Sequence, residues 1–188
     1  MRLVALALGG VILAGPLAAQ EGDAEAGRKL AGQCRTCHGL DGIAQIPVAP
    51  NIGGEPAGYL ARQLEAFRSG ARVNEMMSVV AASLSDAQIA DLAAWYASHV
   101  PVATLAADPA DAPELCSACH GVDGISVIED APNLAGENSI YIETQLKAFR
   151  TGKRESPVMG PITTELSDED IRAVADWYAA TRLEIPSP

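Results

Sequence analysis

The sequence predicts an all-α protein built from two tandem domains that are related by an internal repeat. Three observations lead to this prediction. Residue identities recur at a constant offset of 82 positions, apolar residues follow helical spacing, and no segment shows a convincing strand pattern. Every aromatic residue belongs to a pair at this offset, and nearly half of the positions between Cys34 and Ala97 match their counterparts. The repeat therefore predicts two homologous domains.

The N-terminus predicts a secretory signal peptide over residues 1–19. Met1-Arg2 gives a positive start, an apolar run extends from Leu3 to Ala14, and small residues lead up to Ala19. The run is shorter than the roughly 20 apolar residues that a membrane-spanning helix needs, although an uncleaved anchor remains the alternative. We therefore expect an exported, soluble protein without a permanent membrane span.

The repeat and its interruption set the expected domain boundaries. The first domain is expected at 20–100 and the second at 101–188, with 101–112 mostly linker. Residues 24–33 are good helix formers, so a helix that ends just before Cys34 is expected in the first domain. The corresponding helix of the second domain is expected to be cut to about one turn, because Pro113 cannot lie inside a helix.

The remaining helices are expected in both domains. Tyr59 to Arg68 carries an amphipathic stripe, and Gly70 follows as a helix stop. Ser85 and Ser167 are expected to begin the last helix of each domain, each with a residue three positions later that completes a capping box.

A five-residue motif, C-x-x-C-H, occurs once in each domain and uses all four cysteines of the chain. Two thiols at this spacing can reach two vinyl groups of one porphyrin and form thioethers, and the next side chain can bind the iron. The motif therefore predicts one covalent haem c in each domain, with the domain wrapped around it. The residues concerned are Cys34, Cys37 and His38 in the first domain and Cys116, Cys119 and His120 in the second.

Two other uses of paired cysteines fit less well. The two C-x-x-C pairs of a zinc ribbon lie roughly 15–20 residues apart, whereas these lie 82 apart and each adjoins a histidine. A redox-active disulfide needs no such histidine and is expected near a βαβ pattern, which the sequence does not show. Two covalent haem groups, each with an iron, remain the prediction.

The second axial ligand of each iron is predicted by exclusion. Outside the two motifs the second domain offers Met159 and no histidine, with core packing as the alternative role of Met159. The first domain offers Met76, Met77 and His99. The repeat pairs Met159 with Met77, and His99 is expected to be exposed at the start of the linker. We therefore predict His38 and Met77 at one iron and His120 and Met159 at the other. Ligation by histidine and methionine fills both axial positions and favours electron transfer over catalysis.

With these motifs the chain resembles class I c-type cytochromes, and specifically the dihaem cytochrome c4 family, over nearly all of its mature length. The resemblance implies that a proline carbonyl accepts the second imidazole proton of each haem-ligating histidine. The matching prolines are Pro50 and Pro132, each twelve residues after its histidine. The resemblance also implies a periplasmic location and two domains paired about a pseudo-twofold axis with their haem propionates close together.

Four further residues match between the repeats and are candidates to contact those propionates. For the arginines, a solvated position at a helix end is the alternative. The four residues are Tyr59, Arg72, Tyr141 and Arg154.

Charge narrows the class of partner. The chain carries 24 acidic and 13 basic side chains, so nucleic acid, which requires a basic surface, is an implausible partner. The leading interpretation is a carrier of electrons between a quinol-oxidising complex and a terminal oxidase or reductase, without substrate chemistry of its own. The alternative is the haem subunit of a periplasmic dehydrogenase such as a flavocytochrome. A dihaem enzyme is disfavoured, because the second domain has neither a cysteine nor a histidine to spare.

Overall fold

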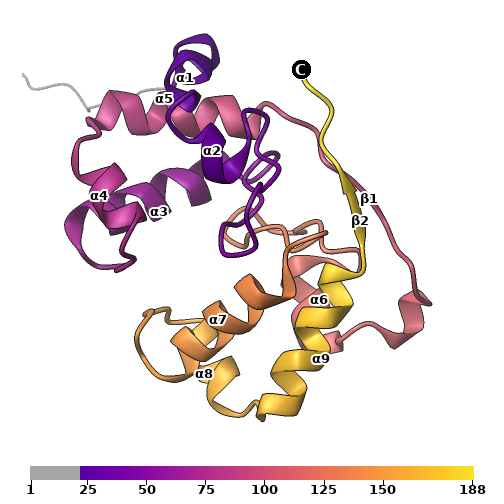
Figure 1. Ribbon diagram of the computed structural model, residues 1–188. Coiled ribbons are helices and arrows are strands. Elements are labelled where there is room, and N and C mark those ends of the chain that lie inside the picture. The colour runs from indigo at the N-terminus through magenta and orange to yellow at the C-terminus, as the bar shows by residue number, and fades with distance from the viewer. Residues whose placement is uncertain (1–21) are drawn as a thin grey trace, which may run out of the picture.

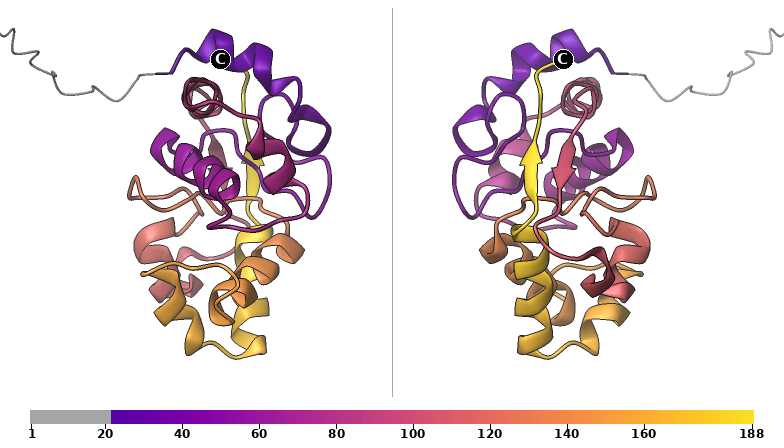
Figure 2. Two further views of the ribbon diagram at one scale, coloured as in Figure 1. Left: turned by 90° about the vertical axis from the view of Figure 1, so that its left-hand side faces the viewer. Right: turned by 90° about the vertical axis from the view of Figure 1, so that its right-hand side faces the viewer.

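The structure, a computed structural model, describes residues 22–188. The predicted signal peptide at 1–19 lies outside these residues. Two helical domains lie one above the other, the first drawn in indigo to magenta and the second in orange to yellow (Figure 1). Views from both sides show the same order of the two domains and a pair of short strands along the molecule (Figure 2).

Between residues 22 and 100 the first domain contains five helices, and several of their ends follow local sequence signals. The Asp23 side chain accepts hydrogen bonds from two backbone N–H groups at the start of the first helix. Gly70 ends the third helix in the left-handed conformation, as the sequence predicts. Ser85 begins the last helix with the predicted capping box. The helices are α1 (Ala24–Ala31), α2 (Arg35–His38), α3 (Ala57–Ser69), α4 (Met77–Ala82) and α5 (Asp86–Ala97).

The second domain repeats this plan without a counterpart of α1. A single 3-10 turn precedes Pro113, and the helix after this proline has only two residues before its first cysteine, which agrees with the predicted shortening. Ser167 begins the last helix with the second predicted capping box. The elements are η1 (Pro109–Asp111), α6 (Glu114–His120), α7 (Ser139–Arg150), α8 (Met159–Thr164) and α9 (Asp168–Ala179).

Each domain has a small core between its long helices. In the first domain α5 packs against both α1 and α3, whereas α9 of the second domain packs mainly against α7. Ile89, Leu92, Ala93 and Tyr96 form the buried face of α5, and the largest fully buried side chain of the described residues is Tyr178 of α9. Burial of these faces supplies most of the favourable free energy that holds the helices together.

Two short strands depart from the predicted absence of strands. β1 (Val102–Thr104) follows α5 and pairs antiparallel with β2 (Arg182–Glu184), which follows α9. After β2 the C-terminal segment runs along the first domain (Figure 1). There Ile185 is buried, and the Ser187 hydroxyl donates a hydrogen bond of 2.9 Å to the Asp41 carboxylate. Part of the predicted linker is therefore a strand that the end of the chain covers.

Two backbone pairings show how the domains are related. Val102 pairs with Glu184, and Arg72 forms an antiparallel bridge with Arg154. Each residue thus pairs with its own counterpart in the repeat. A residue can lie antiparallel to its own equivalent only beside a twofold axis, so the domains are related by a pseudo-twofold axis and the surface between them is isologous.

His99 is not exposed, contrary to the sequence-based expectation. It is 3% exposed, and its ring lies edge-on to Trp95 with centroids 4.7 Å apart. Its two ring nitrogens lie 3.0 Å from the Trp95 carbonyl oxygen and 3.4 Å from the Asp41 carboxylate. His99 is thus packed at the end of α5 by contacts with its own helix and with the loop after the first C-x-x-C-H motif.

Candidate haem-binding sites

The two C-x-x-C-H motifs occupy equivalent short helices. Cys34 caps α2, which ends at His38, and the second motif lies in α6, which ends at His120. None of the four cysteines lies in a disulfide. Burial raises the pKa of the Cys34 and Cys116 thiols, although a hydrogen bond with Tyr96 partly opposes the rise at Cys34. Neither pair forms a disulfide, so both pairs are available for thioether bonds.

Each motif histidine is oriented by a proline carbonyl. The Nδ1 atom of His38 lies 2.9 Å from the Pro50 carbonyl oxygen, and that of His120 lies 2.8 Å from the Pro132 carbonyl oxygen. A carbonyl can only accept, so Nδ1 carries the proton and Nε2 keeps its lone pair. Burial lowers the pKa of both imidazoles, with the carbonyl bond in opposition, which favours the neutral form that binds a metal.

A tight contact between two loops places each proline. In the first domain the backbone N–H of Ile52 donates to the Gly42 carbonyl at 2.8 Å. Gly42 has a φ of +89°, and a Cβ there would lie 2.1 Å from the Gly53 nitrogen. Only glycine allows this approach, because it alone combines positive φ with the absence of a side chain. The second domain repeats the arrangement at Gly124, whose carbonyl accepts a hydrogen bond from the Leu134 N–H at 2.7 Å.

The tryptophan of the last helix of each domain donates a hydrogen bond to the backbone just after the C-x-x-C-H motif. Trp95 Nε1 donates to the Leu40 carbonyl at 2.9 Å, and Trp177 Nε1 donates to the Val122 carbonyl at 3.1 Å. The shortened leading helix of the second domain predicts that Trp177 and Tyr178 are more exposed than Trp95 and Tyr96. That is correct for Trp177, which is only half-buried, but wrong for Tyr178, which is fully buried among α7 and α9 side chains.

Met77 and Met159 lie at equivalent positions of the repeat, and each is the first residue of a short helix. The Met77 N–H donates to the Asn74 side chain at 3.0 Å, and the Met159 N–H donates to the Ser156 hydroxyl at 3.0 Å. Met77 is partly buried and Met159 packs against the core of its domain, whereas Met76 is 66% exposed. This difference in burial favours the register that pairs Met77 with Met159.

The donor set of each domain fits a covalent haem c. Each domain offers two free thiols, one neutral imidazole with an oriented ring, and one partly buried thioether. Within residues 22–188, no three His, Cys, Asp or Glu side chains gather to form a metal site made of protein ligands alone. The cysteine pairs therefore do not meet as a zinc site would require.

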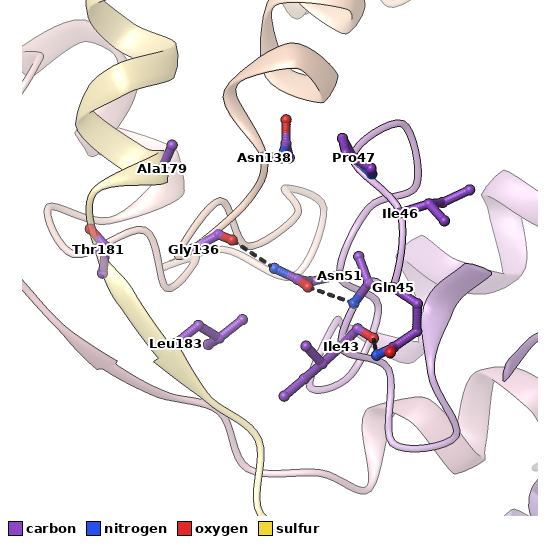
Figure 3. Close-up of a pocket in the computed structure, with 11 residues that line it drawn as sticks. Ile43, Gln45, Ile46, Pro47, Asn51, Gly136, Asn138, Ala179, Thr181 and Leu183 are labelled. Carbon is purple, nitrogen blue, oxygen red and sulfur yellow. Dashed lines mark hydrogen bonds between the residues drawn. The ribbon is translucent and has the colours of Figure 1, made fainter. Parts of the chain in front are cut away.

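Polar side chains join the two domains in reciprocal pairs. The Asn51 side-chain amide donates to the Gly136 carbonyl at 3.0 Å, and its counterpart Asn133 donates to the Gly54 carbonyl at 2.9 Å. Both partners of the first bond, Asn51 and Gly136, line a cavity of about 360 Å³ between the domains (Figure 3). These bonds connect the loop that carries each proline to the opposite domain.

The matched arginines also bind across the interface. Arg72 donates to Tyr141 and Gln145 at 3.2 and 2.8 Å, and Arg154 donates to the equivalent residues of the first domain at 3.1 and 2.9 Å. Each guanidinium also lies over the ring of a phenylalanine of its own domain. These arginines are not solvated helix ends, because they connect the domains. Their exact match in the repeat is the only sequence signal of this role.

Comparisons with known proteins agree with this geometry. Residues 24–99 match a protein-family model described as cytochrome c, and residues 111–177 match one described as cytochrome c oxidase, cbb3-type, subunit III. A protein named cytochrome c4 from Pseudomonas aeruginosa is 32% identical over 181 residues, which cover 86% of this chain and 90% of that protein.

The chain belongs to the cytochrome c4 family. A crystal structure of reduced recombinant cytochrome c4 from Pseudomonas stutzeri superposes with a TM-score of 0.75 at 29% identity, and the match covers 86% of this chain and 100% of the other. A protein named thiosulfate dehydrogenase electron acceptor, from Stutzerimonas stutzeri, is 36% identical over 169 residues, 78% of this chain and 77% of that protein.

Membership of the cytochrome c4 family confirms three predictions. The fold consists of two class I cytochrome c domains, each domain carries one covalent haem c at its cysteine pair, and the protein transfers electrons without substrate chemistry of its own. Its partners are other redox proteins. Between residues 22 and 188, no helix combines the length and the apolar character needed to cross a membrane.

Proposed function

We propose that this cytochrome carries electrons in the periplasm between a quinol-oxidising complex and a terminal oxidase or reductase. The observation that supports the proposal most strongly is the equivalence of the two sites. Each domain presents one C-x-x-C-H motif, one histidine held by a proline carbonyl, and one methionine at the same place in the repeat. Two similar one-electron sites in one chain suit a carrier. Export through a signal peptide at 1–19 is part of the proposal.

In this proposal His38 and Met77 bind one iron, and His120 and Met159 bind the other. When bound, each haem supplies a one-electron couple that a thioether ligand shifts toward the reduced form. Pro50 and Pro132 keep the imidazole rings in one orientation and one tautomer. With a histidine and a methionine holding each iron, no position on the metal would remain for a substrate.

Arg72 and Arg154 have a second proposed task at the interface. Their hydrogen-bond acceptors are the neutral side chains of tyrosine and glutamine. Two positive charges therefore lie where the domains meet and remain uncompensated by those contacts. This arrangement supports a role in holding the negative propionate groups of the haems near one another.

The surface charge supports a protein partner with a basic or neutral docking surface. The chain has a net charge of −11, and removal of Arg2 with the signal peptide makes the mature chain more acidic. Opposite charge on a partner accelerates association, and added salt weakens that acceleration.

A second candidate is the electron acceptor of a periplasmic dehydrogenase. It is favoured by the relative from Stutzerimonas stutzeri, whose name describes the acceptor of thiosulfate dehydrogenase. Both candidates use the same two sites and differ only in the protein that donates electrons.

One experiment separates them. The oxidised dihaem protein is mixed either with quinol and membranes that contain a quinol-oxidising complex, or with thiosulfate and purified thiosulfate dehydrogenase, and haem reduction is followed by absorbance. Proteins captured by the tagged cytochrome from periplasm and membranes are identified by mass spectrometry. Fast, salt-sensitive reduction in the quinol mixture supports the main proposal. Fast reduction only with thiosulfate supports the second candidate, and slow reduction in both mixtures contradicts both.

A further inference from the structure

Two carboxyl groups are buried between the domains. Glu55 is 4% exposed and Glu137 is 3% exposed, and the repeat relates one to the other. Within residues 22–188, neither of them forms an ion pair with a lysine, arginine or histidine. One oxygen of Glu137 is buried without any hydrogen-bond partner. Buried carboxylates without a counter-charge cost several kcal/mol, so such groups hold a proton instead.

Glu55 is connected to the haem-ligating histidine of the other domain. The Asn133 backbone N–H donates to the Glu55 carboxylate at 2.9 Å. That N–H belongs to the same peptide group as the Pro132 carbonyl. The oxygen of this carbonyl accepts a hydrogen bond from His120 Nδ1 at 2.8 Å. A single peptide group therefore lies between the carboxyl group of the first domain and the histidine of the second.

Glu137 is the residue that the repeat relates to Glu55. The Asn51 backbone N–H partly offsets the rise in the pKa of Glu137. That N–H belongs to the same peptide group as the Pro50 carbonyl, which lies 2.9 Å from His38 Nδ1. Glu55 thus holds its peptide group by a direct hydrogen bond, and Glu137 acts on the equivalent peptide group of the first domain through its charge.

Burial and the repulsion between the two carboxyl groups favour a bound proton on the pair. Burial raises the pKa of Glu55 to about 8, although the Asn133 N–H acts in the opposite direction. Burial raises the pKa of Glu137 well above its ordinary value, and the neighbouring Glu55 raises it further. The other titratable or charged groups of this cluster are Tyr59, Tyr141, Arg72 and Arg154. The arginines donate to the tyrosines and glutamines and not to these carboxyl groups.

We propose that Glu55 and Glu137 form a proton-binding site that couples electron uptake to proton uptake, each carboxyl acting on the haem of the opposite domain. An ionised carboxyl at the peptide N–H makes the attached proline carbonyl a stronger acceptor, which gives the histidine more imidazolate character and favours ferric iron. In the pH range where a carboxyl of the pair is ionised in the oxidised protein, the arrival of one electron from a redox partner at the haem is accompanied by the uptake of one proton from solvent by the pair. Loss of the electron releases that proton.

A cavity reaches the loop that carries Glu137. The cavity of about 360 Å³ between the domains is lined by Gly136 and Asn138, the residues on either side of Glu137 (Figure 3). Asn51, whose backbone N–H partly offsets the rise in the pKa of Glu137, lines the same cavity. A proton can therefore reach the loop that carries Glu137 without separation of the domains.

The test is a redox titration of the purified dihaem protein, with each haem resolved, at several pH values on both sides of pH 8. Both midpoint potentials are expected to fall as the pH rises, because ionised carboxyls favour the oxidised haem. Glu55→Gln is expected to remove this dependence mainly at the Cys116 haem, and Glu137→Gln mainly at the Cys34 haem. The double variant is expected to remove it at both. Glu65→Gln and Glu169→Gln, at exposed positions of the two domains, are the matched controls and are expected to keep the wild-type slopes.

A second readout does not depend on the substitutions. The infrared difference spectrum between oxidised and reduced wild-type protein is expected to contain a band of a protonated carboxyl group, lost in the double variant. Potentials that do not change with pH, together with the absence of this band, would overturn the proposal. If a single variant lost the pH dependence of the potential only at the haem of its own domain, the assignment of each glutamate to the haem of the opposite domain would be overturned. The proposal rests on two redox-active haems and not on the identity of the partner, so these measurements can fail independently of the proposed function.

Discussion

Glu55→Gln is expected to change how the stability of the protein depends on pH. The pKa of Glu55 is about 8 in the folded protein, against an ordinary value of 4.5. Between these two values the folded protein holds a proton that the unfolded chain has released, so the free energy of unfolding falls as the pH rises. A difference of one pKa unit corresponds to about 1.4 kcal/mol, which gives a loss of roughly 3–6 kcal/mol across the interval. Glutamine does not titrate, and its amide oxygen can still accept the Asn133 N–H.

The difference between wild type and variant isolates this effect, because all other titrating groups are common to both. Denaturant unfolding of the dihaem protein is followed at a series of pH values from about 4.5 to above 8. The two proteins are expected to have similar free energies of unfolding at the acid end, and the variant is expected to be the more stable at the alkaline end. Glu65→Gln, at an exposed position, is expected to stay within about 0.5 kcal/mol of wild type at every pH. Parallel curves for wild type and Glu55→Gln would refute the reasoning.

Two further predictions concern the haems. Met77→Ala is expected to convert the Cys34 haem from low-spin to an open or misligated state, whereas Met76→Ala, at a position 66% exposed, should leave the absorption spectrum nearly unchanged; the reverse result would show that the repeat slips by one residue in this loop. Residues 20–100 carry 9 acidic and 6 basic side chains, and residues 101–188 carry 15 and 6. The more negative second domain favours oxidised iron, so the Cys116 haem is expected to titrate at the lower potential in low salt; a higher potential there would show that charge imbalance does not order the two sites.

The attachment motifs were predictable because they are linear and repeated. The resemblance to class I c-type cytochromes identified Pro50 and Pro132, and their carbonyls lie within hydrogen-bond distance of the two motif imidazoles. The long helices were predictable because their signals, capping residues and helical periodicity, act between residues that are close in the sequence.

The features that the sequence analysis missed depend on contacts between distant segments. The strands around Val102 and Glu184 are three residues long and carry no alternating pattern, and they exist because the end of the chain returns to the linker. His99 was expected to be exposed because it adjoins the linker, yet Trp95 and Asp41 enclose it. The sequence shows only that Glu55 matches Glu137 in the repeat. It does not predict their burial, because glutamate is normally a surface residue and here the opposite domain covers it.

The self-pairing of Val102 with Glu184 and of Arg72 with Arg154 has a consequence for how the two halves stay together. Isologous surfaces of this kind join identical subunits in symmetric dimers, where association depends on subunit concentration. Here a connecting segment, exposed from Ala106 to Ala110, makes the association intramolecular, with an effective concentration on the order of millimolar for a short flexible connection. A modest polar interface can therefore persist at any dilution. A cut in this segment would let the halves separate on dilution and return both glutamates to water, so the proton affinity of the pair depends on the continuity of the chain.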